Sequence, residues 1–575
     1  MKKVAVIFII IGVMVLGAYL YVRFSINTPG FTPAQARDTT EVTKPAETLL
    51  DLKPKLVEKL QQLVKQGSNG LYNLFIHELK PDLLNSRITI SNASLIPDTA
   101  VLKSLDKSNL PDAIFKIKTD SIWIDGLGLK DILSKDVIDV KSIHILQPTI
   151  EVYSQQQSSN RNGSSKTLYQ HLMNQMKHIG VGKVVIERGT LISHHPEKKP
   201  DTKFNDIAIN LSDILIDSAT QYDHNRFLFA KDAQLTMKDY AVPTSNHLYT
   251  FKVGTISIAA TRQLLVAKNI KLEPHYSQDE FQNHIKTQLE RYSINIPSME
   301  FRNTNWWNLI NNETLESDFA SINSADISVY LDRRKTADGG MRKSFPHQLI
   351  MKLPLKVNIK KLDVGDLDLS YEEFSTLSKQ KGKLEISNIH GTISNLTNLP
   401  RAIRRNHITT VKALGNFLKT TPAYLTLKFD LNNYKSGIFS AELKSGKGFD
   451  GTLVNSVSEP MGLFMVKKGR LKELTAYITG DNNKASGDVL MLYDDLHITP
   501  MKKDPQNNEL KKKSVTSFIA NTFVLKDENP SKDGQVRKET ASFTRKSGTF
   551  FNLIWKTIFV GILKTIGAPE KLAYQ

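Results

Sequence analysis

The sequence predicts a mainly β protein: an elongated, twisted antiparallel sheet or groove built from loose β-repeats, with a few short helices. From Arg87 onward, apolar and polar residues alternate with a period of two, as in Ile88 to Ser91. This alternation is typical of strands with one buried and one solvated face. Turn residues separate the alternating segments, and no long heptad run appears. An N-terminal transmembrane helix and a C-terminal amphipathic helix complete the expected fold.

The composition narrows the class of protein. The chain has 575 residues, of which 40% are hydrophobic, so a wholly disordered protein is excluded. It contains no cysteine, which excludes disulfide frameworks, thiolate metal sites and cysteine nucleophiles. Lys and Arg number 76 against 58 acidic residues, and the formal net charge is +18. This balance suggests anionic partners such as nucleic acid, phospholipid headgroups or lipopolysaccharide.

Residues 1–23 are expected to form a membrane anchor. Val4 to Val22 carries no charge, and a helix of this length would span about 28 Å, close to the hydrocarbon core of a bilayer. A cleaved signal peptide is the alternative, with Leu16-Gly17-Ala18 as its cleavage site. Lys2 and Lys3 precede the span and favour a cytoplasmic N-terminus. Because the rest of the chain would then lie outside the cytoplasm, we expect lipid, and no nucleic acid, as the anionic partner.

Residues 24–86 are expected to hold a linker and amphipathic helices. Ser25 to Glu47 is rich in Thr, Pro and Ala and has no apolar periodicity, as expected of a linker. Two groups of apolar residues then recur at helical spacing, separated by Gly70. The first group is Leu56, Leu60, Leu63 and Val64, and the second is Leu71, Leu74, Phe75 and Leu79.

Residues 87–345 and 346–500 are expected to form a first and a second β-repeat region. Each loose repeat has one strand with an Ile-x-Ile or Val-x-Ile core, a short turn, and a second strand that ends in a polar loop. The apolar face would either line a groove that shields acyl chains or pack against helices or a second sheet in a closed core. The candidate groove residues are Ile143, Ile145, Ile207, Ile209, Ile256, Ile258, Val357 and Ile359.

Residues 501–549 are expected to be a basic loop and closing strands, and residues 550–575 a C-terminal amphipathic helix. Seven large apolar residues share an arc of about 140° on a helical wheel: Phe551, Ile554, Trp555, Ile558, Phe559, Ile562 and Ile566. Two lysines make a membrane span less suitable than a helix at a membrane surface or on a partner. The alternative is a lid helix over the end of the sheet. The membrane-surface candidates are Phe551, Trp555, Lys556, Phe559 and Lys564.

No catalytic or metal site emerges from the motifs. The sequence lacks a phosphate-binding Gly loop, a GxSxG elbow and both His-Glu metalloprotease patterns. His194 and His195 are adjacent, but neighbouring strand residues point to opposite faces and do not readily chelate one ion. We therefore expect no enzyme activity, no catalytic residues, no metal and no cofactor.

Several segments resemble the AsmA-like envelope proteins, the group that includes the TamB-like and other bridge-type lipid-transport proteins. Segments similar to the strand patterns of this family are Val137 to Tyr153, Gly182 to Leu191, Leu353 to Glu372 and Gly382 to Asn398. Ala485 to Leu492 and the tail Phe550 to Gly567 resemble the terminal segment of a Bacteroidetes-type branch. The resemblance implies a single-pass anchor in the bacterial inner membrane. It also implies a periplasmic β-groove whose apolar inner face shields acyl chains.

Two functions remain open from the sequence. One is a non-enzymatic, membrane-anchored envelope protein that binds or channels lipid acyl chains along an apolar β-groove and assists outer-envelope assembly. The alternative is a structural or scaffold protein of the envelope with a closed β core and no lipid cargo. The expected partners are phospholipid or glycolipid, the inner membrane and, through the C-terminal helix, other envelope proteins. The expected location is the inner membrane, with the bulk of the chain in the periplasm.

Overall fold

The computed structural model describes residues 54–574 with a set of gaps. The gaps are residues 55–56, 59–60, 63, 66–67, 69, 83, 106–112, 127–136, 155–177, 195–201, 218, 221–222, 224–225, 228, 245, 307, 310–313, 337–342, 354, 377, 504–509, 513–524 and 547. The predicted anchor at Val4 to Val22 and the predicted linker lie outside the described residues. Within the described residues, no helix combines the length and the apolar character needed to cross a membrane.

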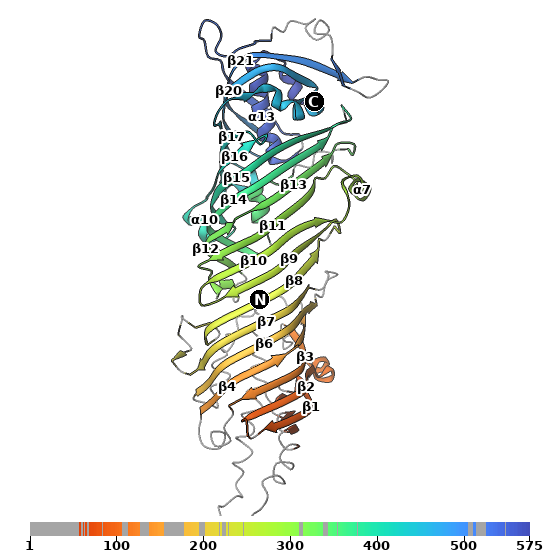
Figure 1. Ribbon diagram of the computed structural model, residues 1–575, viewed down its shortest axis with the longest axis vertical. Coiled ribbons are helices and arrows are strands. Elements are labelled where there is room, and N and C mark those ends of the chain that lie inside the picture. Colours follow the sequence, from red (N-terminus) through yellow and green to blue (C-terminus); the bar gives the residue numbers. More distant parts are fainter. Residues whose placement is uncertain are drawn as a thin grey trace, which may run out of the picture. The chain divides into compact units, whose positions relative to one another are not determined.

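The protein is mainly β, as the sequence predicts, with 61% strand and few, short helices (Figure 1). The chain divides into two compact units. Unit 1 comprises Met1–Ser245 and Val253–Ala267, and unit 2 comprises Asn246–Lys252 and Lys268–Gln575. Each unit is described by itself below.

Besides helical residues between 54 and 65, the described part of unit 1 contains eight strands and a short helix. They are β1 (Tyr72–Asp82), β2 (Arg87–Pro97), α4 (Thr99–Ser104), β3 (Ala113–Asp125), β4 (Val137–Leu146), β5 (Thr149–Ser154), β6 (His178–His194), β7 (Thr202–Ile216) and β8 (Ala230–Pro243). Strands β1, β2 and β3 pair antiparallel in chain order, and so do β6, β7 and β8. Two further strands, β9 (Tyr249–Ala259) and β10 (Leu264–Pro274), have residues in both units.

Unit 2 holds the remaining strands and most of the helices. Its strands are β11 (Arg291–Arg302), β12 (Thr314–Ile322), β13 (Ala325–Asp332), β14 (Lys356–Phe374), β15 (Lys381–Thr397), β16 (Ile408–Phe417), β17 (Thr421–Asp430), β18 (Phe439–Ser445), β19 (Phe449–Asp450), β20 (Phe464–Gly480), β21 (Lys484–Lys503), β22 (Leu510–Lys512) and β23 (Lys538–Thr544). Its helices are α7 (Gln278–Phe281), η2 (Gln282–His284), α9 (Pro346–Met351), α10 (Pro400–Arg405), η3 (Tyr434–Ser436), η4 (Gly451–Val454), α11 (Asn455–Gly462), α13 (Phe550–Thr565) and η5 (Glu570–Tyr574).

The strand pairing is mixed, so the prediction of an antiparallel sheet is wrong in this respect. In unit 1, β4 and β5 lie end to end in one row, antiparallel to β3 and parallel to β6. In unit 2, β12 and β13 form the same kind of row, antiparallel to β11 and parallel to β14. A parallel pair needs a long connection between its strands, and 23 residues separate β5 from β6 (155–177) and β13 from β14 (333–355) in the sequence. Alternation of apolar residues does not reveal strand direction.

In each unit, the long strand that runs parallel to a two-strand row is irregular. These long strands are β6, beside β4 and β5, and β14, beside β12 and β13. Strands β6 and β14 each show a register shift against the next antiparallel strand. Arg188 and Asp366 have positive φ angles of 54° and 44° at these shifts. Beside Arg188, a Cβ added to Gly189 would lie 3.4 Å from the Cγ atom of Pro148, in the break of the neighbouring row. The arrangement of a broken row beside an irregular long strand thus occurs once in each unit.

The segment after Gly70 is a strand, so the second predicted amphipathic helix is wrong. β1 pairs with β2 from Tyr72 to Asp82. Leu74 and Leu79 are both buried, whereas Phe75 is 52% exposed. The buried face therefore changes parity between Leu74 and Leu79, near Asn92 of β2, whose φ is 49°. This change gives a strand the apolar spacing of a helix.

The first predicted helix is present in the described residues between 54 and 65, which are helical. Its Val57 and Val64 pack against the hydrophobic cluster of unit 1.

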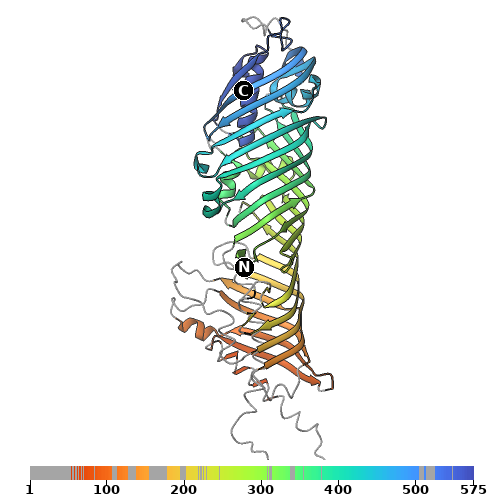
Figure 2. The same cartoon turned by 90° about the vertical axis from the view of Figure 1, so that its left-hand side faces the viewer.

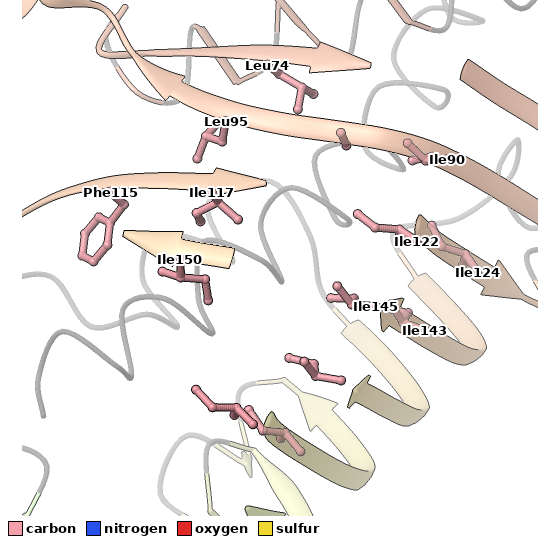
Figure 3. Close-up of a cluster of buried hydrophobic side chains, with 14 of the residues drawn as sticks. Leu74, Ile90, Leu95, Phe115, Ile117, Ile122, Ile124, Ile143, Ile145 and Ile150 are labelled. Atoms are coloured by element: carbon pink, nitrogen blue, oxygen red, sulfur yellow. The ribbon is translucent and has the colours of Figure 1, made fainter. Parts of the chain in front are cut away.

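Unit 1 has one apolar and one polar sheet face. Figure 3 shows apolar side chains from successive strands gathered on the same face. Charged residues pair across strands elsewhere: the Nζ atom of Lys116 lies 3.1 Å from a carboxylate oxygen of Glu151, and Arg87 pairs with Asp125 at 2.5 Å. These pairs lie on the solvated side that the alternation predicts.

The C-terminal helix is confirmed as α13, which covers one face of strands in unit 2 (Figure 2). Thr549 caps its first turn by accepting a hydrogen bond from the backbone N–H of Asn552 at 3.2 Å. Gly561 lets the helix approach β21 closely, because an added Cβ would lie 2.5 Å from the Cβ of Val489. The apolar face of this part of unit 2 is thus closed by a helix.

Candidate functional site

Three apolar ladders cross the strands of unit 1 on the face of its hydrophobic cluster. In each ladder, the residues that lie directly opposite one another on successive strands are all apolar. The first ladder is Leu79, Ile90, Ile122, Ile145, Ile186, Ile209 and Leu235. The second is Ile88, Ile124, Ile143, Val184, Leu211 and Ala233. The third is Leu74, Leu95, Ile117, Ile150, Leu191 and Phe204.

The first ladder is longer than a lipid acyl chain. With neighbouring strands about 4.8 Å apart, the first ladder, from β1 to β8, is about 29 Å long. One leaflet of a bilayer contributes about half of a 30 Å hydrocarbon core. The apolar surface is therefore longer than one acyl chain, and its ladder side chains carry no polar atom.

Four of the eight candidate groove residues contribute to this surface. Ile143 and Ile145 of β4 and Ile207 and Ile209 of β7 are all buried in the hydrophobic cluster of unit 1. Three of them are members of a ladder, and Ile207 lies beside Gly189. These four residues share one apolar face, and their role in a lipid groove stays a prediction.

The other four candidates lie elsewhere. Ile256 and Ile258 of β9 are only partly buried. Val357 and Ile359 of β14 are buried in unit 2, where Val357 lies opposite Leu315 and Ile359 opposite Leu396. They belong neither to the unit 1 cluster nor to the cluster around α13.

Most ladder members were not among the sequence-based candidates. Ile122, Ile186 and Ile117 sit in alternating segments, so their side of the strand was predictable from the period of two. The register that places them opposite one another depends on the pairing of distant strands, including the parallel pair of β4 and β6. No local pattern in the sequence encodes that pairing.

The C-terminal candidates divide into exposed and buried side chains. Phe551 and Trp555 are 61% and 43% exposed, and the Trp555 ring stacks on Phe559 with 5.8 Å between centroids. Lys564 donates a hydrogen bond to the backbone oxygen of Thr540 at 2.9 Å. A role at a membrane surface stays a prediction, while packing on the sheet corresponds to the lid alternative.

The buried face of α13 differs from the predicted apolar arc. Of that arc, Ile554, Ile558 and Ile566 are buried. Thr557 and Thr565 are also buried, because each hydroxyl donates to the carbonyl oxygen four residues earlier at 2.8 Å. The helical-wheel prediction counted threonine as a solvent-facing residue and ignored these internal hydrogen bonds. It therefore placed the buried face of the helix too far from the side that packs on the sheet.

Charged side chains cluster near the ends of β13 and β14. The guanidinium of Arg333 forms two hydrogen bonds with the carboxylate of Glu373, one of them 3.0 Å long. The hydroxyl of Tyr371 donates to the same carboxylate at 2.7 Å, and burial, followed by the charge of Glu373, raises the pKa of Tyr371 well above its ordinary value. This cluster is a hydrogen-bonded ion pair with a protonated tyrosine, so it lacks a free base for proton transfer.

No metal site is found in the described part of the chain, where no group of three His, Asp or Glu side chains could hold an ion. The ring of His194 stacks on Tyr153 with 4.4 Å between centroids, and its Nε2 atom lies 3.7 Å from a carboxylate oxygen of Glu151.

A buried histidine in α9 is expected to make stability depend on pH. His347 is 0% exposed and stacks on Phe429, and neither ring nitrogen has a hydrogen-bond partner in the described residues. Burial lowers the pKa of His347 to about 4. The unfolded chain binds this proton near pH 6.5, before the folded chain does, so stability falls as the pH drops from about 6.5 to about 4. The expected loss is about 3 kcal/mol.

Denaturant unfolding at pH 7 and pH 4.5 checks this expectation in the wild type and in His347→Phe. Between pH 7 and pH 4.5, the free energy of unfolding should decrease more in the wild type than in the variant, since carboxylates titrate in both proteins. Equal pH dependence in the two proteins would show that His347 does not contribute.

Neither the family models nor the curated proteins that were compared with this chain include a match.

Proposed function

We propose that this chain is a non-enzymatic protein that binds lipid acyl chains on the apolar ladders of unit 1. The observation that carries the proposal is the uninterrupted alignment of hydrocarbon side chains across seven strand rows. A surface of this kind offers an acyl chain no polar group to desolvate. Burial of apolar area contributes about 25 cal/mol per Å², so contact along a whole chain would be strongly favourable.

The predicted anchor would determine where in the cell this lipid binding takes place. A helix at Val4 to Val22 would hold the protein at the inner membrane, with the sheet in the periplasm, as the resemblance to AsmA-like proteins implies. The lipid would be a phospholipid or glycolipid, and the role would be to bind or channel its chains during assembly of the outer envelope.

A second candidate function is a structural or scaffold protein without lipid cargo. The packing of α13 favours it, since this helix closes an apolar sheet face in unit 2 with side chains of the chain itself. If the apolar face of unit 1 is covered in the same way, the ladders are an ordinary hydrophobic core.

Organic extraction of the purified full chain, followed by mass spectrometry, separates the two functions. The chain should be isolated from its membrane beside an unrelated single-pass membrane protein that has received identical treatment. We expect at least one lipid molecule for each protein chain, well above the control. Lipid at the level of the control would favour the scaffold.

A further inference from the structure

A small apolar cavity lies between α13 and the sheet of unit 2. Its volume is about 90 Å³. The floor consists of two rows that cross β17, β18 and β20: Leu425, Leu443 and Ala476, and beside them Leu427, Ala441 and Ile478. Phe551, Ile554 and Ile558 of α13 form the roof. The two alanines do not fill the space under the helix, and a cavity lined only by apolar side chains stays dry and accepts hydrocarbon.

An exposed apolar strip begins at the roof of this cavity. Phe551 both lines the cavity and is largely exposed, and Trp555 lies one helical turn further on. Phe464 continues the strip by stacking on Phe559, with 6.2 Å between centroids. Large apolar side chains rarely stay exposed together on a helix that is otherwise buried, so the strip is suited to a hydrocarbon ligand.

A lysine without an acidic partner follows this strip. The described residues show no hydrogen bond or ion pair for the ammonium of Lys556. Burial lowers the pKa of Lys556, and the positive charge of Arg333 acts in the same direction. The nearby carboxylate of Glu373 is already bound by Arg333 and Tyr371. An anion beside Lys556 would therefore find an uncompensated positive charge.

We propose that α13 binds one single-chain anionic amphiphile, with its tail end in the cavity, its chain across Phe551 and Trp555, and its acidic head at Lys556. The order of these residues around the helix agrees with this path. At 100° per residue, Ile554, Phe551, Trp555 and Lys556 follow one another over about 200°. On a helix about 10–12 Å wide, that arc measures roughly 17–21 Å. An acyl chain of one bilayer leaflet is about 15 Å long, so the head group and the flexible side chain of Lys556 must cover the remaining few ångströms.

This site is distinct from the ladders of unit 1. It involves different residues in a different unit, so either proposal can fail while the other holds. A carboxylate and a phosphate head share the required chemistry, and the choice of probe distinguishes them.

Quenching of Trp555 fluorescence tests the site in the full chain, kept soluble by an amphipathic polymer. The probe is dodecanoate brominated in mid-chain, with unbrominated dodecanoate, dodecyl phosphate and dodecanol as competitors. We expect saturable quenching by one molecule for each chain, absent in Trp555→Phe. Both anions should displace the probe, whereas dodecanol should compete at least about tenfold more weakly. Displacement by only one of the two anions would identify the head group.

Two substitutions locate the ends of the ligand. Ala476→Leu fills the cavity and should weaken binding at least about tenfold. Lys556→Gln should weaken binding of dodecanoate but not of dodecanol, whereas Lys564→Gln, on the same helix and paired with Glu570, should leave both unchanged. If Ala476→Leu does not fold, the comparison of Lys556→Gln with Lys564→Gln still tests whether the acidic head binds at Lys556.

Three results would overturn the proposal. They are an absence of saturable quenching, equal binding of dodecanol and dodecanoate, and quenching that occurs only with vesicles of brominated phospholipid. The last result would assign α13 to a membrane surface.

Discussion

Replacing Ile145 with aspartate is expected to abolish lipid binding while the strands of unit 1 remain formed. Ile145 is 2% exposed and lies between Ile122 and Ile186 in the first ladder. If the ladders face exchangeable acyl chains, water can replace the lipid and solvate the carboxylate. Lipid recovered with the protein should then fall more than about tenfold, a change that needs only about 1.4 kcal/mol.

Circular dichroism and lipid mass spectrometry, applied to the same preparation, check this result. Lys141→Asp is the matched control, because Lys141 is an exposed residue on the same strand. The same outcome is expected of Ile258→Asp and Val357→Asp if their strands also face lipid. A closed core would instead lose several kcal/mol of stability around a buried, unpaired charge. Global loss of the β signal in Ile145→Asp would therefore support the scaffold function.

Replacing Arg545 with alanine is expected to be the most destabilising single change in unit 2. Arg545 is 1% exposed. Its Nη2 atom donates to the backbone oxygens of Lys343 at 2.6 Å and Gly548 at 2.5 Å. Its guanidinium lies 4.7 Å from the ring centroid of Phe345. The residue thus joins segments far apart in the sequence at the start of α13. Loss of these charge-assisted bonds should lower the free energy of unfolding by about 3–5 kcal/mol.

Denaturant unfolding measures this effect against Arg404→Ala, a change at an exposed arginine of α10 that should lie within about 0.5 kcal/mol of the wild type. Arg545→Lys should recover part of the loss, because lysine keeps the charge but not the planar fork. A loss below about 1 kcal/mol in Arg545→Ala would show that water replaces the guanidinium without strain.

The fold class was predictable because a two-residue period reports directly on strands. Ile143 and Ile145 alternate with polar neighbours, and both lie in the hydrophobic cluster of unit 1. The same reasoning failed for Leu74 and Leu79, because the buried face of β1 changes parity between them and imitates helical spacing. The apolar pattern of β1 does not reveal this change, because the backbone irregularity that accompanies it, the positive φ of Asn92, lies in the partner strand β2.

The candidate site was less predictable than the fold. Strand direction and register depend on pairing between distant segments, so neither the parallel pair of β4 and β6 nor the ladders could be read from local pattern. Burial on α13 was misjudged for a different reason. Thr557 satisfies its own hydroxyl within the helix, and a residue that does so can be buried at little cost.

Photo-crosslinking from a ladder position tests the central claim most directly. Val184 of β6 is a partly buried member of the second ladder, and its neighbour Lys183 is exposed. A small diazirine amino acid is introduced at position 184 or 183 of the full chain, and its adducts are identified by mass spectrometry after irradiation in the membrane. Acyl-chain lipid binding predicts lipid adducts at position 184 in large excess over position 183. Adducts at position 184 to residues of the chain itself, without lipid, would contradict it.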